Sequence, residues 1–260
     1  MLMLKNLENL SREQVFLGAS LIGLILLTWL LTVFQVQTMD NSMLVANPSI
    51  SSSGMILSAF ADFVLMWSTM MVAMMLPVAT PTILAFDRLA QQESQNQSLP
   101  LSGIFGASYI LAWILFGIVA YPAILAVQAL DPFIDFQNVN SILILLAGVY
   151  QFSPLKQNCV NHLQNPYNFI NSLWQKGLRG AFFMGMQYGW HCIVCCWGLM
   201  LVLIALDLMN LMVMSILTIV ILIEKVSSNG VLISRLAGVS FVAYGIWSIV
   251  FDLFDNIHSI

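Results

Sequence analysis

The pattern of hydrophobic and polar positions divides the chain into seven apolar stretches separated by short polar segments. A helix needs about 20 mostly apolar residues to cross roughly 30 Å of hydrocarbon. The stretches are therefore interpreted as a bundle of about seven transmembrane helices, an all-α fold in which the fourth and sixth spans are short. They cover approximately residues 16–34, 55–86, 101–130, 139–155, 181–206, 208–223 and 236–254.

Positive charge falls on one side of this arrangement. With a cytoplasmic N-terminus, all eight Lys and Arg residues face the cytoplasm, and the charged residues of the opposite loops are all acidic. Cytoplasmic loops of membrane proteins carry an excess of Lys and Arg. The sequence therefore predicts an N-terminus inside and a C-terminus outside. It also predicts a short cytoplasmic segment over residues 1–14 and a single transmembrane domain over residues 1–260.

Composition excludes several function classes. Hydrophobic residues make up 60% of the 260 residues and charged residues 8%, whereas a soluble domain is about 25% charged. Water-soluble enzymes and disordered chains are excluded on this ground. Eight basic residues against twelve acidic ones leave no basic surface for nucleic acid. The expected partners are the lipid bilayer and other membrane subunits.

Candidate chemistry concentrates in the fifth apolar stretch, where His191, Cys192, Cys195 and Cys196 lie within six residues. Side chains three and four positions apart share a helix face, so the three thiols are expected together, with His191 facing Cys195. Thiolates favour Cu(I), and thiolates with imidazole also suit zinc. Cysteine is also an ordinary small apolar residue in a buried helix, so structural packing stays an alternative.

Two further groups of residues extend this hypothesis. Cys159 and His162 are spaced to share a metal on a helix or turn, although a solvated loop thiol beside a histidine is equally consistent with the sequence. Met70 and Met74 belong to a methionine stripe on the second span, and such stripes more often pack or face lipid. Their alternative role is that of thioether ligands along which Cu(I) moves.

Three sequence blocks resemble a bacterial family of predicted metal-binding integral membrane proteins, a domain of unknown function. The resemblance covers about residues 67–225 and implies a metal site in a bacterial cytoplasmic (inner) membrane protein, but no reaction. The family's usual second cysteine after Cys159 corresponds here to Leu163, with His162 the nearest substitute. The blocks are Trp67-x-x-Met70-x-x-Ala73-Met74-Met75-x-Pro77, Tyr150-Gln151-x-Ser153-Pro154-Leu155-Lys156-x-x-Cys159 and Gly185-x-x-x-Gly189-x-x-Cys192-x-x-Cys195-Cys196-Trp197-x-Leu199-Met200, followed by Glu224-Lys225.

Three functions compete at this stage, and the sequence leaves open whether the protein is an enzyme. The first is binding of a soft metal, with copper(I) the first choice and zinc the second, for transport or delivery to a membrane partner. The second is a quinone-linked membrane thiol oxidoreductase, because Cys192 and Cys195 have the spacing of a redox pair. The third is an accessory subunit of a larger membrane complex. The proposed metal ligands are Cys192, Cys195, Cys196, His191, Cys159, His162, Met70 and Met74.

Overall fold

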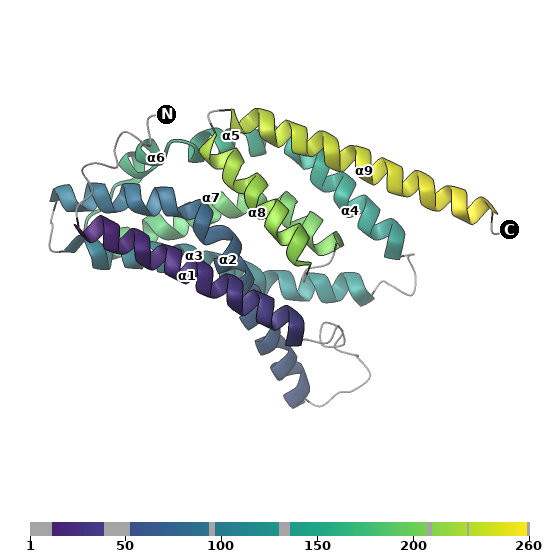
Figure 1. The fold of residues 1–260 in the computed structure, drawn as a ribbon, viewed down its shortest axis with the longest axis horizontal. Coiled ribbons are helices and arrows are strands. Elements are labelled where there is room, and N and C mark those ends of the chain that lie inside the picture. Colours follow the sequence, from purple (N-terminus) through teal and green to yellow (C-terminus); the bar gives the residue numbers. More distant parts are fainter. Residues whose placement is uncertain are drawn as a thin grey trace. The chain divides into compact units, whose positions relative to one another are not determined.

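The computed structural model describes residues 12–38, 53–93, 97–129, 136–206, 210–227 and 229–258. Within these residues the regular structure is entirely helical, so the predicted all-α class is confirmed (Figure 1). The helices are α1 (Arg12–Thr38), α2 (Ser53–Glu93), α3 (Ser98–Ala129), α4 (Phe136–Gln151), α5 (Pro154–Leu163), α6 (Pro166–Leu173), α7 (Gly177–Leu206), α8 (Leu211–Val226) and α9 (Gly230–His258).

Five helices are long and apolar enough to cross a membrane, namely α1, α2, α3, α7 and α9. The stretches expected as the fourth and sixth spans form α4 and α8, which have 16 residues each. At about 1.5 Å per residue such a helix reaches roughly 24 Å, less than the roughly 30 Å of a hydrocarbon core. Seven spans and the orientation of the termini stay predictions. Of the predicted segment over residues 1–14, residues 1–11 lie outside the described part.

Contacts along the chain group it into two compact units. The first comprises Met1–Leu115 and Asn165–Trp190, and the second comprises Phe116–Gln164 and His191–Ile260. Both α3 and α7 therefore contribute to each unit. The single transmembrane domain over residues 1–260 stays a prediction.

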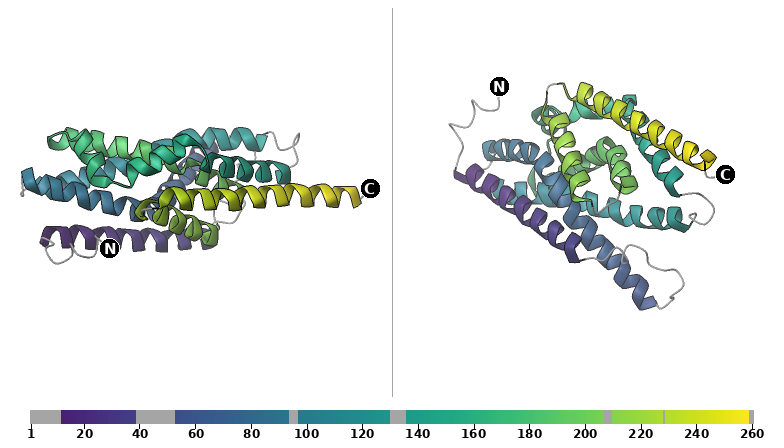
Figure 2. Two further views of the ribbon diagram at one scale, coloured as in Figure 1. Left: turned by 90° about the horizontal axis from the view of Figure 1, so that it is seen from above. Right: turned by 45° about the vertical axis from the view of Figure 1, so that its right-hand side comes forward.

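In the first unit, α1 and α6 each pack against α2, and Figure 2 shows α1 running beside α2. Buried hydrogen bonds connect the longer helices. Trp67 Nε1 on α2 donates to the Trp113 carbonyl oxygen on α3 at 3.0 Å, and Thr82 Oγ1 donates to Tyr188 Oη on α7 at 3.0 Å. These bonds fix the register of α2, whose interior contains Pro77 and Pro81.

In the second unit, α4 packs along α9, while α5 and α8 also contact α9 (Figure 1). Glycines allow α4 and α9 to approach closely, because a Cβ on Gly148 would meet Val242 N at 2.8 Å and the Gly238 oxygen at 3.1 Å. Ser141 Oγ donates to Ser248 Oγ at 2.8 Å along the same contact.

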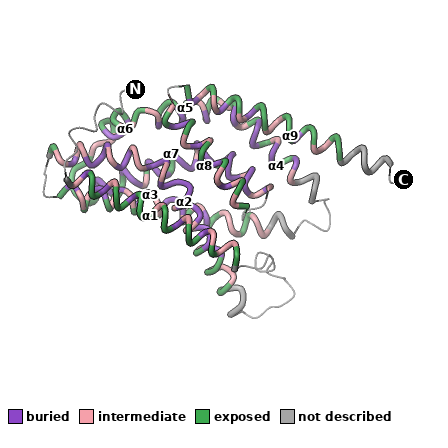
Figure 3. Tube along the Cα trace, in the orientation of Figure 1, coloured by how far each residue is buried: buried purple, intermediate pink, exposed green. Residues whose placement is uncertain are grey.

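Burial separates the helices that carry the core from those that face outwards. Buried positions fill 61% of the most apolar window of α7 but 17% of that of α9. Figure 3 shows the difference as mainly buried turns along α7 and exposed turns along α9. Apolar side chains that remain exposed on α9, such as Leu236 and Trp247, are what a lipid-facing helix surface requires.

The close approach of α4 and α9 predicts an unusual response to a small substitution. Ala is normally favoured over Gly inside a helix by about 1 kcal/mol, but overpacking costs about 1–3 kcal/mol. We expect Gly148→Ala to lower the thermal stability of the detergent-solubilised protein, followed by circular dichroism. Gly103→Ala is the matched control, because a Cβ at Gly103 meets nothing within 4 Å. Equal stability of both variants would contradict the close helix approach.

Candidate metal centre

The three cysteines of α7 lie on one buried helix face. Cys192, Cys195 and Cys196 are exposed to only 0%, 1% and 1%. The 3.6-residue repeat places such positions one turn apart, and side-chain hydrogen bonds join Cys195 to Cys196 and Cys196 to Cys192. The three thiols of α7 therefore contact one another, while their role as a metal-binding cluster stays a prediction.

Cys159 joins this group from α5, where sequence reasoning allowed a loop, turn or helix. Helix α5 begins sharply, because Pro154 occupies its first turn and the Ser153 side chain accepts a hydrogen bond from Lys156 N, as expected of an N-cap. Cys159 Sγ then lies 3.0 Å from the His191 carbonyl oxygen, to which it donates. It also shares a side-chain hydrogen bond with Cys195. All four cysteines of the chain thus form one connected thiol cluster, and all four are free thiols.

The contact with Cys195 changes the acidity of the outermost thiol. The hydrogen bond from the Cys195 thiol lowers the pKa of the Cys159 thiol below its ordinary value, against the opposing effect of burial. The Lys225 ammonium acts in the same direction. Since the thiolate is the form that binds metals, this environment favours Cys159 as a ligand.

A buried lysine, Lys156, contacts the backbone of the thiol cluster and a buried carboxylate. Lys156 is fully buried, its Nζ donates to the Cys195 carbonyl oxygen at 2.7 Å, and it lies 2.8 Å from Glu224 Oε1. Burial alone would lower the pKa of Lys156, but the Cys195 sulfur and the Glu224 carboxylate raise it above its ordinary value. Lys156 therefore carries its positive charge inside the second unit.

A second lysine contacts a thiol directly. Lys225 Nζ donates to Cys192 Sγ at 2.8 Å, and the lysine is 7% exposed. At the same end of α8, Gln164 Nε2 donates to the carbonyl oxygens of Glu224 and Ser227 at 3.1 and 2.8 Å. These bonds satisfy oxygens that the end of a helix leaves without partners, and they fix α8 against α5.

The two histidines lie beside the cluster, nearer the surface. The His162 and His191 rings are 5.7 Å apart between centroids. His162 is exposed and His191 is partly exposed. His162 lies three residues after Cys159 on α5, and the backbone of His191 accepts the hydrogen bond of the Cys159 thiol.

The two predicted methionine ligands belong to the first unit, whereas the thiol cluster belongs to the second. Met70 and Met74 are buried in α2, with exposures of 2% and 0%. Nearby, Tyr109 Oη donates to the Met75 carbonyl oxygen at 3.3 Å. A packing role accounts for this burial, and their role as relay ligands stays a prediction.

Among the described residues, no three His, Cys, Asp or Glu side chains are arranged as a ready-made metal site. The cysteines instead contact one another in a series, from Cys159 through Cys195 and Cys196 to Cys192. Buried sulfur donors of this kind suit a soft cation.

Comparison with protein-family models matches residues 64–248 to PpoB2, described as a copper chaperone. The chain belongs to the PpoB2 copper chaperone family. The match includes all eight proposed ligands and the core predicted at about residues 67–225. The metal-related part of the sequence-based resemblance agrees with this family, while its integral-membrane part stays a prediction. No curated protein and no solved structure matched the chain.

Sequence reasoning missed the charged residues of this PpoB2-family site. Glu224 and Lys225 appeared in the sequence only after the third resemblance block, but in the structure Glu224 pairs with Lys156 and Lys225 contacts Cys192. In the sequence, Lys156 and Lys225 were used only to assign the cytoplasmic side. The signal that could have identified them as site residues is their position in, or directly after, the sequence blocks that contain the cysteines.

Tyr150 also supports the thiol-bearing helix. Its Oη donates to the Val194 carbonyl oxygen at 2.5 Å, and its ring meets Trp197 edge-on at 5.3 Å. This contact holds the end of α4 against α7 at the level of the cysteines. We interpret Tyr150 as a positioning residue for the backbone between Cys192 and Cys195.

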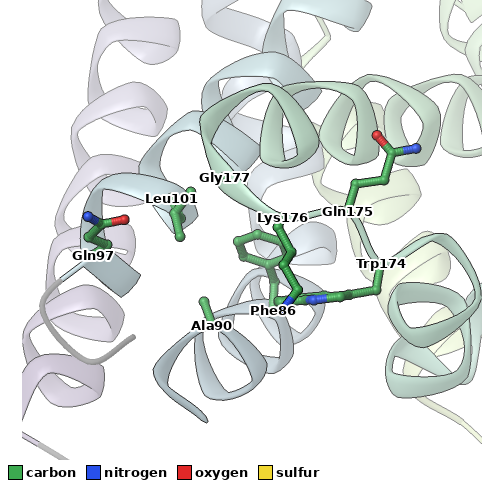
Figure 4. A pocket seen from close by; sticks show the side chains of 8 residues that line it. All are labelled: Phe86, Ala90, Gln97, Leu101, Trp174, Gln175, Lys176 and Gly177. Carbon is green, nitrogen blue, oxygen red and sulfur yellow. The ribbon is translucent and has the colours of Figure 1, made fainter. Parts of the chain in front are cut away.

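A cavity of about 340 Å³ lies in the first unit (Figure 4). The Phe86 ring and the Trp174 indole form part of its wall, with centroids 5.6 Å apart. Its lining side chains include no sulfur or imidazole ligand, so it does not suit a copper ion. They are Phe86, Ala90, Gln97, Leu101, Trp174, Gln175, Lys176 and Gly177.

The buried ion pair of the PpoB2-family site predicts a large loss of stability. Removing one partner of such a pair costs about 3–5 kcal/mol, because the other charge stays buried. We expect Lys156→Met to lower the unfolding free energy by that amount in denaturant titrations. Arg235→Met is the control, since this cation is exposed and donates to Gln157 Oε1 at 2.9 Å.

A double variant separates the charge from the packing. Lys156→Met with Glu224→Leu removes both charges, and apolar replacement of a buried pair is often nearly neutral. We expect it to be more stable than Lys156→Met alone. If the double variant loses as much stability as Lys156→Met and Glu224→Leu lose in sum when made singly, the ion pair is contradicted.

Proposed function

We propose that this protein is a membrane copper chaperone, which binds Cu(I) at the thiol cluster of Cys159, Cys192, Cys195 and Cys196 and delivers it to a membrane partner. The observation that carries the proposal is the gathering of all four cysteines by α5 and α7, in a chain of the PpoB2 copper chaperone family. Copper(I) is the cargo of the protein rather than a permanent cofactor.

The donor set supports Cu(I) as the preferred ion. Thiolates are soft ligands that select Cu(I), and Cu(I) is stable between only two sulfur atoms. The cluster offers two such pairs, Cys159 with Cys195 and Cys192 with Cys196. A structural zinc ion requires four ligands in a tetrahedron, for which His191 and His162 would have to join the thiols.

The five long apolar helices support a place in a membrane. We assign the protein to the bacterial cytoplasmic membrane, with the N-terminus inside, on the distribution of its cations. The lipid bilayer is then its first partner, and a membrane protein that receives copper is the second. Met70 and Met74 would act as relay ligands only if copper passes through the first unit.

Copper binding is expected to depend on the α7 thiols. Protein purified in detergent under reducing conditions, loaded with Cu(I) and desalted, should retain copper by elemental analysis. The Cys195→Ser, Cys196→Ser double variant should retain little, because hydroxyls are poor ligands for a soft cation. Met212→Leu is the matched control, since it removes an exposed sulfur of α8 outside the cluster.

Folding of the variant is checked by circular dichroism, and Cys192→Ser provides a second variant with the same expected loss. A wild-type protein that retains no copper at normal yield would overturn the proposal. If such a protein instead forms a disulfide between Cys192 and Cys195 when quinone is added, the thiol oxidoreductase takes its place.

The placement of Cys159 predicts a separate effect. A solvated loop thiol would contribute nothing to copper binding, whereas a thiol in contact with Cys195 contributes to affinity. We expect Cys159→Ser to weaken Cu(I) binding by about tenfold or more, equivalent to about 1.4 kcal/mol, in competition with a chromophoric Cu(I) chelator. Ser172→Ala, on α6 of the first unit, should leave the affinity unchanged. Equal affinities of the Cys159 variant and the wild type would remove Cys159 from the site.

A further inference from the structure

Two histidines meet beside the thiol cluster, and the proposed copper site uses neither of them. His162 lies in the last turn of α5 and His191 lies on α7, and both belong to the second unit. Their ring centroids are 5.7 Å apart, and the ring planes are tilted by 36°. The fold thus brings two imidazole rings together outside the four sulfur atoms.

The spacing of the two rings suits one shared metal ion. Imidazoles that bind the same ion have ring centroids up to roughly 6.3 Å apart, because each metal–nitrogen bond is about 2.0–2.1 Å long and the nitrogen lies about 1.1 Å from the centroid. The 5.7 Å between His162 and His191 falls within this limit. Each ring has two nitrogen atoms, and a metal-binding histidine generally donates a hydrogen bond through the second one. Other contacts of the rings are therefore compatible with a bond to an ion.

The backbone that carries both rings is held in place. Two residues after His162, Gln164 Nε2 donates to the Glu224 carbonyl oxygen at 3.1 Å, which fixes the end of α5. On α7, the His191 carbonyl oxygen accepts a hydrogen bond from Cys159 Sγ at 3.0 Å. Ligands on fixed helices keep the geometry that a metal site requires.

Access distinguishes the histidine pair from the thiols of α7. His162 is exposed and His191 is partly exposed, whereas Cys192 and Cys196 are exposed to only 0% and 1%. His191 also lies within a candidate membrane span, and ionisable side chains in such segments are rare and typically functional. An ion that arrives from outside the protein therefore meets the imidazoles before it reaches the buried thiols of α7.

The number of available ligands favours Cu(I) at this pair. Among the residues that the structure describes, no three His, Cys, Asp or Glu side chains form a metal site, so an ion between the rings has two protein ligands. Imidazole is a good ligand for copper, and Cu(I) is stable with two ligands. A structural zinc ion takes four ligands and is not matched by two rings.

We propose that His162 and His191 form a second copper position, separate from the thiol cluster, in which one Cu(I) ion lies between the two imidazole rings. This proposal rests on the proposed function, because it takes Cu(I) as the cargo, and it adds a nitrogen site on the exposed side of the buried sulfur site. Each ring donates the lone pair of one nitrogen atom to the ion, and no electron is transferred.

The test uses X-ray absorption at the copper edge, which distinguishes nitrogen from sulfur ligands. Full-length protein in detergent, in a reducing buffer free of nitrogen ligands, is loaded with increasing equivalents of Cu(I). The first copper to bind should show sulfur ligands alone, and a nitrogen shell should appear once the thiols are filled.

The histidine variants identify the source of the nitrogen. His162→Gln and His191→Gln should each lose the nitrogen shell and retain one copper ion fewer per chain by elemental analysis, with an unchanged affinity for the first ion. His258→Gln is the matched control, since it removes the remaining histidine of the chain, and it should behave as the wild type. Circular dichroism of each variant verifies the helical content.

The outcomes separate this inference from the proposed function. Copper bound by sulfur alone at every loading overturns the histidine position and leaves the thiol site intact. Copper bound by nitrogen alone overturns the thiol site and supports the histidine position. Nitrogen together with sulfur around the first ion, or a nitrogen shell that persists in both histidine variants, overturns the separate position. A protein that binds no Cu(I) overturns both.

Discussion

The thiol cluster depends on the side chain of Lys156, which joins three helices at one ammonium group. The residue itself belongs to α5, its Nζ donates to the Cys195 carbonyl oxygen of α7, and it pairs with Glu224 of α8. Because Cys159 follows Lys156 by less than one helical turn, the contact that binds α5 to α7 also determines where Cys159 lies. The positions of the four sulfur atoms and of the second lysine follow from this arrangement.

Burying an ion pair between helices costs desolvation free energy that its Coulomb attraction only partly offsets. Well-packed apolar side chains often serve as well or better, because they avoid the desolvation of two charges. The second unit nevertheless has apolar contacts available, as the close packing of α4 on α9 shows. The charged groups of this unit lie directly against the thiol cluster, with Lys156 on the Cys195 backbone and Lys225 on the Cys192 sulfur.

The sequence was sufficient for the features that depend on local pattern. The helical class followed from apolar stretches, and the shared face of Cys192, Cys195 and Cys196 followed from helical spacing. The contact of Cys159 with Cys195 could not be predicted from the sequence, because that contact depends on how α5 folds back after a turn at Ser153. The ion pair of Lys156 and Glu224 also could not be predicted from the sequence, because the two residues are 68 positions apart, on helices that only the fold brings together.

Burial and access must both be provided in a protein that binds a metal in order to release it. The α7 thiols are almost inaccessible, whereas Cys159 is 8% exposed and lies beside the partly exposed His191. Sulfur ligands of Cu(I) exchange one at a time, so an incoming thiol must first reach the most accessible sulfur atom. Within the cluster that atom belongs to Cys159, which connects to the inner pair through Cys195 and Cys196. Cys159 thus has the sulfur atom of the cluster that lies nearest the surface, and the three thiols of α7 lie behind it.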